Sequence, residues 1–377
     1  MNLESLGKIY SFNLGVRPTE RVLVFTDRVT KKEKESISNE ELKRRNSLVD
    51  IAKAAAEVGR EYAKEVVYME YPSRGGPAIE PPEKIWRAAF GEKITDSLIR
   101  EQILKAILKK KIDEDGIERA AEIIRKNPVR AVNAVIALSN YSTSHTIFRK
   151  LLTLEAGARY ASMPLFDAAM LEGPMGVNYK EMKKRSHLVE AALKKAAWIE
   201  VKAPNGTRLS FERGKRLVEE DTGDLRRPGS FGNLPAGEVY LAPVEGTADG
   251  RLVLEWAATR KLENPVTLVI ENGMVVLVKG SEPFVNELYQ RFKASPLNAN
   301  VAELGIGTND MAKRPDNILE SEKIAGTAHI ALGDNSTFGG KTKAPFHQDF
   351  VLFKPTVTLF TKRGEKIILL NKGRLEV

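Results

Sequence analysis

Two histidines and several acidic residues in the second half of the chain carry the strongest chemical signal in the sequence. In His347-Gln348-Asp349, the first and third residues of an extended segment point to the same side, so an imidazole and a carboxylate converge. A second imidazole, His329, lies in the run Gly-Thr-Ala-His-Ile-Ala-Leu-Gly, and Glu322 precedes it by seven residues. Imidazole nitrogen and carboxylate oxygen together are typical ligands of divalent transition metals. These residues therefore predict a metal centre.

Two more acidic residues stand beside glycine and proline. Glu238 follows Pro-Ala-Gly at the start of an apolar run, and Glu303 precedes Leu-Gly-Ile-Gly, where small residues let the backbone approach a site closely. A carboxylate in an apolar strand is costly unless its charge is compensated. With the residues above, three Glu, two His and one Asp form the donor set expected of a site for two divalent ions, Zn²⁺ or Co²⁺ by ligand type.

Other features of the composition limit the class of protein. The chain has no cysteine, which excludes disulfides, thiolate nucleophiles, iron–sulfur clusters and zinc sites built on sulfur. Lys and Arg outnumber Asp and Glu by 59 to 50, but the two signs are interspersed, so a nucleic-acid partner is not favoured. Abundant Lys, Arg and Glu without Cys suits a thermophilic protein.

The sequence also bears on location. It has no apolar run of the roughly 18 or more residues that span a bilayer. Its first residues lack the basic and then apolar layout of a signal peptide. We therefore expect a cytoplasmic protein that does not associate with a membrane.

The elements that must position the candidate ligands fall into two patterns. At 377 residues the chain is long enough for two domains. In its first half, short apolar runs alternate with amphipathic stretches, an order typical of a parallel sheet covered by helices. The expected strands are 21–26, 66–69, 131–138 and 159–163, with a long helix over 40–65. We expect an α/β domain with a parallel sheet over residues 1–184.

The second half changes to short strands separated by turns. It follows an amphipathic helix at about 181–197. Asn205-Gly206 between two strand-like runs is a hairpin signal. We expect a β-rich α+β catalytic domain over residues 185–377, which would hold the metal centre.

Four blocks of sequence resemble the metallo-aminopeptidase family typified by thermophilic aminopeptidase T. They are Asn-x-Pro-x-Gly-Glu-Val-x-x-Ala-Pro-x-Glu at 233–245, Glu-Leu-Gly-Ile-Gly-Thr-Asn at 303–309, Gly-Thr-x-His-Ile-Ala-Leu-Gly at 326–333 and His-x-Asp at 347–349. The resemblance implies a homodimer, an N-terminal α/β domain and a C-terminal catalytic domain. It also implies metal ligation by Glu238, Glu303, His329, His347 and Asp349, with Glu322 as a sixth candidate.

In such a peptidase, two metal ions lower the pKa of a bridging water, and a carboxylate takes the proton. Either Glu322 or Glu245 could be this catalytic base. The sequence departs from the family at Ser336, where the peptidases usually carry a tyrosine that assists at the reacting carbonyl. Lys343 is the candidate that replaces it as an electrophile.

Three functions are open at this point, and metal content separates them. The main prediction is a metallo-aminopeptidase, a hydrolase that releases N-terminal amino acids from small peptides with about two divalent ions per chain. The alternative is a ring-cleaving dioxygenase, because enzymes of that type resemble the peptidases in their scaffold. It would hold a single Fe(II) ion with His329, His347 and Asp349. The third is a basic binding protein with a vestigial site and no metal. The retained Glu238 and Glu303 favour two ions.

Overall fold

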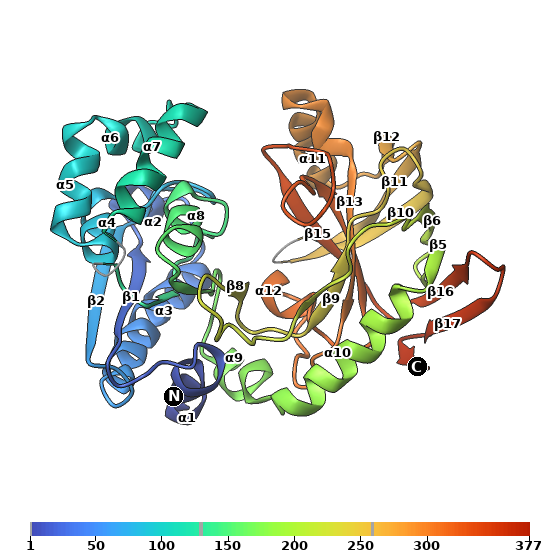
Figure 1. Ribbon diagram of the computed structural model, residues 1–377. Helices are drawn as coiled ribbons and strands as arrows, with labels where there is room; N and C mark the ends of the chain where they lie inside the picture. Colours follow the sequence, from blue (N-terminus) through green and yellow to red (C-terminus); the bar gives the residue numbers. More distant parts are fainter. Residues whose placement is uncertain (1, 128–130, 258–259) are drawn as a thin grey trace. The chain divides into compact units, whose positions relative to one another are not determined.

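The structure, a computed structural model, describes residues 2–127, 131–257 and 260–377. The chain divides into two compact units (Figure 1). The first unit comprises Met1–Gly176 and Gly223–Pro235, and the second comprises Val177–Thr222 and Ala236–Val377. The boundary expected between residues 184 and 185 falls within helix α10 (Tyr179–Leu193).

The first unit is built on a five-stranded parallel sheet with the strand order β2-β1-β3-β4-β8. The strands are β1 (Arg21–Arg28), β2 (Glu65–Pro72), β3 (Ala134–Ala137), β4 (Arg159–Ser162) and β8 (Phe231–Asn233). Strand β8 comes from a segment that lies far along the chain from the other four and pairs with β4 at the edge. The predicted α/β architecture with a parallel sheet is confirmed.

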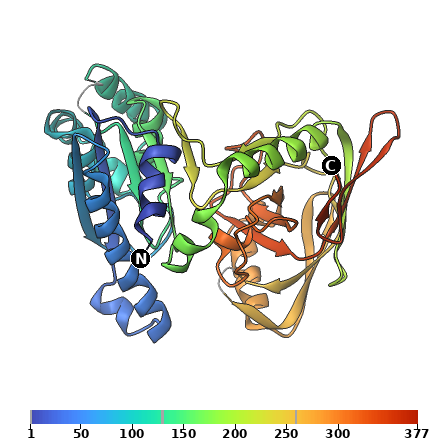
Figure 2. The ribbon, with the colours of Figure 1, turned by 90° about the horizontal axis from the view of Figure 1, so that it is seen from below.

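Helices cover the parallel sheet (Figure 2). The helices of this unit are α1 (Leu3–Lys8), α2 (Lys31–Lys34), α3 (Asn39–Gly59), α4 (Glu83–Phe90), α5 (Glu92–Arg100), α6 (Ile103–Leu108), α7 (Glu114–Arg125), α8 (Ile147–Leu154) and α9 (Ala169–Glu172), of which α3, α4 and α8 contact its strands. Leu23 and Phe25 of β1 pack into one core with residues of α4 to α8. Helix α3 begins where the Ser38 side chain accepts a hydrogen bond from the backbone N–H of Glu41, as an N-cap residue does.

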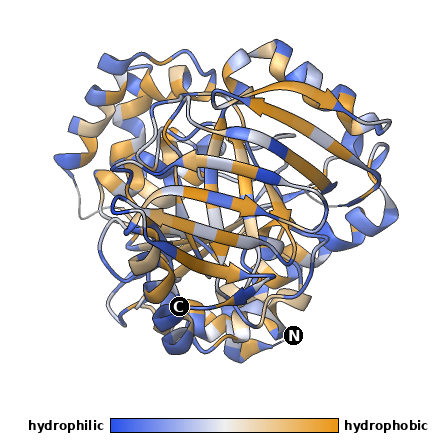
Figure 3. Ribbon diagram, turned by 90° about the vertical axis from the view of Figure 1, so that its right-hand side faces the viewer, coloured by the Kyte–Doolittle hydropathy of each residue, from blue (hydrophilic) through white to orange (hydrophobic). Residues whose placement is uncertain are grey.

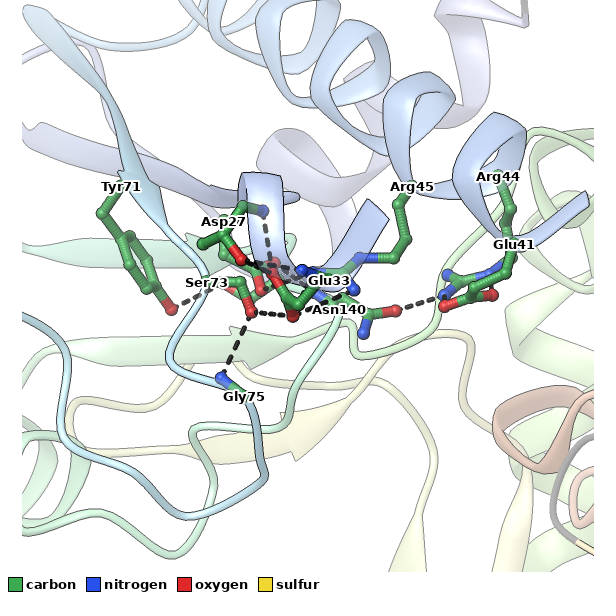
Figure 4. Close-up of polar contacts among 11 residues, drawn as sticks. Asp27, Glu33, Glu41, Arg44, Arg45, Tyr71, Ser73, Gly75 and Asn140 are labelled. Carbon is green, nitrogen blue, oxygen red and sulfur yellow. Dashed lines mark hydrogen bonds and ion pairs between the residues drawn. The ribbon is translucent and has the colours of Figure 1, made fainter. Parts of the chain in front are cut away.

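A buried polar cluster lies where strands β1 and β3 end (Figure 4). One carboxylate oxygen of Asp27 accepts a hydrogen bond from the backbone N–H of Asn140 at 2.6 Å. The guanidinium of Arg45, on helix α3, lies 3.7 Å from Asp27 and 3.2 Å from Glu33. Ser73, in the loop after β2, donates to Glu33 at 2.8 Å. The cluster therefore ties helix α3 and the loop after β2 to the carboxyl end of the sheet.

The second unit consists mainly of two antiparallel sheets. The eight-stranded sheet has the order β12-β11-β10-β6-β5-β16-β17-β18, and the five-stranded sheet has the order β15-β14-β13-β9-β7. The strands are β5 (Ala196–Lys202), β6 (Arg208–Glu212), β7 (Glu219–Asp221), β9 (Glu238–Leu241), β10 (Asp249–Trp256), β11 (Lys261–Glu271), β12 (Met274–Lys279), β13 (Val301–Gly307), β14 (Ala328–Gly333), β15 (His347–Leu352), β16 (Thr356–Thr361), β17 (Lys366–Asn371) and β18 (Arg374–Leu375). The predicted β-rich α+β character is confirmed, and the predicted hairpin joins β5 to β6.

One apolar core is shared by the two antiparallel sheets. Figure 3, coloured by hydropathy, shows strands in which hydrophobic residues are interrupted by hydrophilic ones, as expected for strands with one buried face. The helices of this unit are α10, α11 (Pro283–Ala294) and α12 (Ile318–Ser321). Across the described part of the chain, none of the helices combines the length and the apolar character needed to cross a membrane.

Candidate metal centre

One face of the five-stranded antiparallel sheet carries the predicted ligands. Alternate residues of a strand point to the same face of a sheet. On this face lie Glu238 of β9, Glu303 of β13, His329 of β14, and His347 and Asp349 of β15. The intervening residues of β9, β13 and β14 point into the apolar core. The sheet thus presents five donor groups on one surface.

The donor atoms lie within a few ångströms of one another. The two oxygens of Glu303 face the two imidazoles, with Oε1 3.2 Å from Nε2 of His329 and Oε2 3.5 Å from Nε2 of His347. Oδ1 of Asp349 lies 3.5 Å from Nε2 of His347, and Oε2 of Glu238 lies 3.4 Å from Nε2 of His329. These atoms form two overlapping groups that could hold a metal ion. One consists of Glu238, Glu303 and His329, and the other of Glu303, His347 and Asp349.

Two glycines of strand β13 make room for this arrangement. Gly305 is the register partner of His329 on β14, and a methyl group at Gly305 would lie 2.0 Å from Nε2 of that imidazole. A methyl group at Gly307 would lie 2.1 Å from the carbonyl oxygen of Ile324. Both distances are far below van der Waals contact. The Glu-Leu-Gly-Ile-Gly motif therefore combines a ligand with two positions where only hydrogen fits.

Hydrogen bonding fixes the orientation of His347. Its Nδ1 donates to the backbone carbonyl of Asp334 at 2.7 Å, so Nε2 is left to face the carboxylates. A carbonyl partner of this kind is the usual way in which a metal-binding histidine is held in one tautomer. The second imidazole, that of His329, also has its Nε2 toward Glu303.

The chemistry of the site fits a divalent cation. Glu238 is 8% exposed and His329 is fully buried, yet Oε2 of Glu238 and Nδ1 of His329 have no hydrogen-bond partner among the described residues. An unpaired carboxylate oxygen inside a protein is costly. A cation bound among Glu238, Glu303 and His329 would compensate this oxygen and match the mixed nitrogen and oxygen donors.

Burial and charge act in opposite directions on the ligands. Burial lowers the pKa of both imidazoles, but neighbouring carboxylates outweigh it. The hydrogen bond of Glu303 and the charge of Glu238 raise the pKa of His329 to about 9, and the charge and hydrogen bond of Asp349 raise that of His347 to about 10. Burial opposes the charge of Asp349, but the neighbouring His347 holds the pKa of this carboxyl well below its usual range. Without a metal, the imidazoles therefore carry the compensating charge.

We expect metal binding to release protons. Both imidazoles are protonated near pH 7 before a metal binds, because their pKa values are about 9 and about 10, and a ligating nitrogen must be deprotonated. About one proton should leave for each imidazole that binds an ion at this pH, and the apparent affinity should rise as the pH increases. Calorimetric titration in two buffers with different ionisation enthalpies counts these protons. A count near zero would contradict the prediction.

The structure places Glu245 away from both metal-binding groups. One of its oxygens accepts hydrogen bonds from Nδ2 of Asn335 at 3.0 Å and from the backbone N–H of Lys341 at 2.7 Å. Its other oxygen is paired with Arg216. Glu245 therefore anchors the loop that precedes His347.

Three other predicted residues take different positions. Glu322 is buried beside Glu238, outside the two groups that could hold a metal, and burial raises the pKa of its carboxyl. Ser336 is exposed, and its hydroxyl donates to Oδ1 of Asp334 at 3.0 Å. Lys343 is also exposed.

Two features of the site were missed in the sequence. Lys323 is fully buried, with Nζ 2.5 Å from Oε1 of Glu238 and 2.7 Å from Oε1 of Glu322. Its position directly after the candidate ligand Glu322 could have indicated that it belongs to the site. This indication is weak, because most lysines in proteins are exposed. Two aromatic rings also flank the centre: Phe338 lies 5.9 Å from the ring of His347 and 5.6 Å from that of Tyr240.

Comparisons with known proteins connect this site to ring-cleaving enzymes. A family model described as NicX, 2,5-dihydroxypyridine 5,6-dioxygenase, matches residues 175–370, just over half of the chain. A curated 2,5-dihydroxypyridine 5,6-dioxygenase from Pseudomonas putida KT2440 is 25% identical over 185 residues, which are 45% of this chain and 53% of that protein. The match thus spans about half the length of this relative.

Two solved structures share the fold. The structure of the 2,5-dihydroxypyridine dioxygenase from Pseudomonas putida KT2440 is similar with a TM-score of 0.65 and 19% identity, over 99% of this chain and 96% of that one. Wild-type AmpT from Thermus thermophilus is similar with a TM-score of 0.57 and 15% identity, over 100% of this chain and 99% of that one. At these identities the likeness concerns the fold.

These comparisons correct the predicted function. The aminopeptidase T-like fold is confirmed, but the expected activity of an aminopeptidase, which is a hydrolase and an exopeptidase, is wrong. The family model and the curated relative both carry the name of a dioxygenase. The peptide substrates and the oxyanion role of Lys343 were expected only as parts of that peptidase activity. Solved structures of the two enzyme types both share the fold of this chain, so the fold could not separate them.

Proposed function

Because the chain belongs to the family described as NicX, 2,5-dihydroxypyridine 5,6-dioxygenase, we propose that it is an iron-dependent dioxygenase that opens a dihydroxylated pyridine ring. The observation that carries the proposal is the convergence of His329, His347 and Asp349 beside Glu303 on one sheet face. Two imidazoles and one carboxylate are the ligand set that leaves positions open for substrate and oxygen. An Fe(II) ion bound there would supply the redox chemistry with O₂ that side chains lack.

The chain's own residues would orient the ligands and the substrate. The carbonyl of Asp334 holds the His347 ring with Nε2 toward the ligand set, and the loop that contains this carbonyl is anchored through Glu245. The ring of Phe338 packs edge-to-face against the ring of His347 and against that of Tyr240. A planar ring can pack against such rings in an offset or edge-to-face arrangement. This aromatic wall supports a flat heteroaromatic substrate.

Oxygen uptake tests the proposal. Protein loaded anaerobically with Fe(II) is expected to consume O₂ when 2,5-dihydroxypyridine is added, with loss of the ring absorbance, and to release no amino acid from unblocked dipeptides. The matched control is the His347→Ala variant, which should lack uptake because one imidazole ligand is gone. Amino-acid release from dipeptides without oxygen uptake would overturn the proposal.

A further inference from the structure

A buried ammonium group stands at one end of the ligand set. Nζ of Lys323 lies 2.5 Å from Oε1 of Glu238, 2.7 Å from Oε1 of Glu322 and 4.0 Å from Oδ2 of Asp221. The lysine side chain is fully buried. Lysine is almost never fully buried unless it is paired, and here it has three carboxylates as partners.

The position of Lys323 is fixed by the backbone around it. Its carbonyl oxygen accepts a hydrogen bond from the backbone N–H of Asn309 at 2.9 Å. The same segment crosses strand β13 at Gly307, where a methyl group would lie 2.9 Å from the carbonyl carbon of Lys323. Asn309 is held in turn by a hydrogen bond from its Nδ2 to the carbonyl of Ala236 at 2.8 Å. The ammonium is therefore held in place by close packing.

The two oxygens of Glu238 serve different partners. Oε1 accepts a hydrogen bond from Lys323, whereas Oε2 lies 3.4 Å from Nε2 of His329, on the side of the metal-binding groups. A divalent ion between Glu238 and Glu322 would need the same inner oxygens at about 2.0–2.2 Å. The ammonium already occupies the space between these oxygens, and a second cation there would meet its charge at close range.

We infer that Lys323 is a built-in counter-ion that fills the position of a second metal ion and limits the centre to one ion. The inference rests on the single-iron chemistry of the proposed function and explains how the chain enforces it. It also gives Glu322 a role as the partner of Lys323. Removal of the lysine should then turn Glu238 and Glu322 into ligands of a second ion.

Metal counting tests the inference directly. The wild type and its variants are incubated anaerobically with excess Fe(II), and in parallel with Co(II), then desalted and analysed for metal and protein. We expect about one ion per chain in the wild type and about two in Lys323→Ala. The double variant Lys323→Ala/Glu322→Gln should return to about one ion, because the second site has lost a carboxylate. Lys341→Ala, which removes an exposed lysine, should remain at about one ion.

The outcomes are decisive in both directions. About two ions in the wild type, or about one in a folded Lys323→Ala chain, would overturn the inference. If Lys323→Ala does not fold, Lys323→Ser takes its place, since its short side chain also leaves the space between the two carboxylates open, and the expected count is again about two. The counts need no turnover. A wild type with one ion and no oxygen uptake would therefore refute the proposed function and leave the role of Lys323 standing.

Discussion

Gly305→Ala is expected to remove most of the iron from the protein and to lower its rate of oxygen uptake at least about 10²-fold. The added methyl group would lie 2.0 Å from Nε2 and 2.1 Å from Cε1 of His329, so the imidazole must move by more than an ångström. His329 is fully buried and has little space into which it can turn. A displacement of this size at a ligand removes it from the donor set.

The matched control is Gly176→Ala, because a methyl group at Gly176 meets nothing within 4 Å among the described residues. Iron content, oxygen uptake and circular dichroism should be measured for both variants. We expect the control to resemble the wild type in all three. A Gly305→Ala protein that keeps full iron and full activity would show that His329 is not a ligand.

Arg45→Met is expected to lower the free energy of unfolding by about 3–5 kcal/mol. The side chains of Arg45 and Asp27 are each only 1% exposed, so loss of the guanidinium leaves a buried carboxylate with its charge unpaired. Burial already raises the pKa of Asp27, which shows that its environment opposes the charge. The methionine side chain keeps most of the apolar contacts of the arginine stem.

Chemical denaturation followed by circular dichroism measures the effect. Arg60→Met is the control, since its ion pair with Glu57 has side chains that are 65% and 70% exposed, and such pairs contribute at most about 1 kcal/mol. Adding Asp27→Asn to Arg45→Met should recover part of the loss, because the unpaired charge is removed. Equal stability of Arg45→Met and the wild type would mean that Asp27 is neutral in the folded protein.

The strands that carry the candidate ligands could be predicted, because residues able to bind a metal recur there at the two-residue period of a strand. His347 and Asp349 share a face through the two-residue repeat of a strand, and the glycines after Glu303 mark a close approach. The sequence could not show which residue approaches these glycines, because the contact between Gly305 and His329 depends on strand register. Register between β13 and β14 is set by tertiary packing across the sheet.

The environment of other side chains near the ligands could not be predicted, for one physical reason. Glu245 and Lys343 are predicted catalytic residues, and in the structure the first anchors a loop and the second is exposed. Lys323 was missed because burial of its ammonium depends on carboxylates from β7 and β9 that are distant in sequence. The period of a strand can be read from neighbouring residues. The environment of a side chain depends on segments that meet only in the folded chain.

The return of strand β8 to the parallel sheet determines how this protein can be divided. The chain passes between the two units after Gly176, after Thr222 and after Pro235, so neither unit is a continuous stretch of sequence. A fragment that ended at Gly176 would lose β8 and leave β4, which still pairs with β3, as an uncovered edge strand. A single recombination point therefore cannot exchange one unit intact. Transplanting the metal-binding unit into another protein requires three cuts and a linker that replaces Gly223–Pro235.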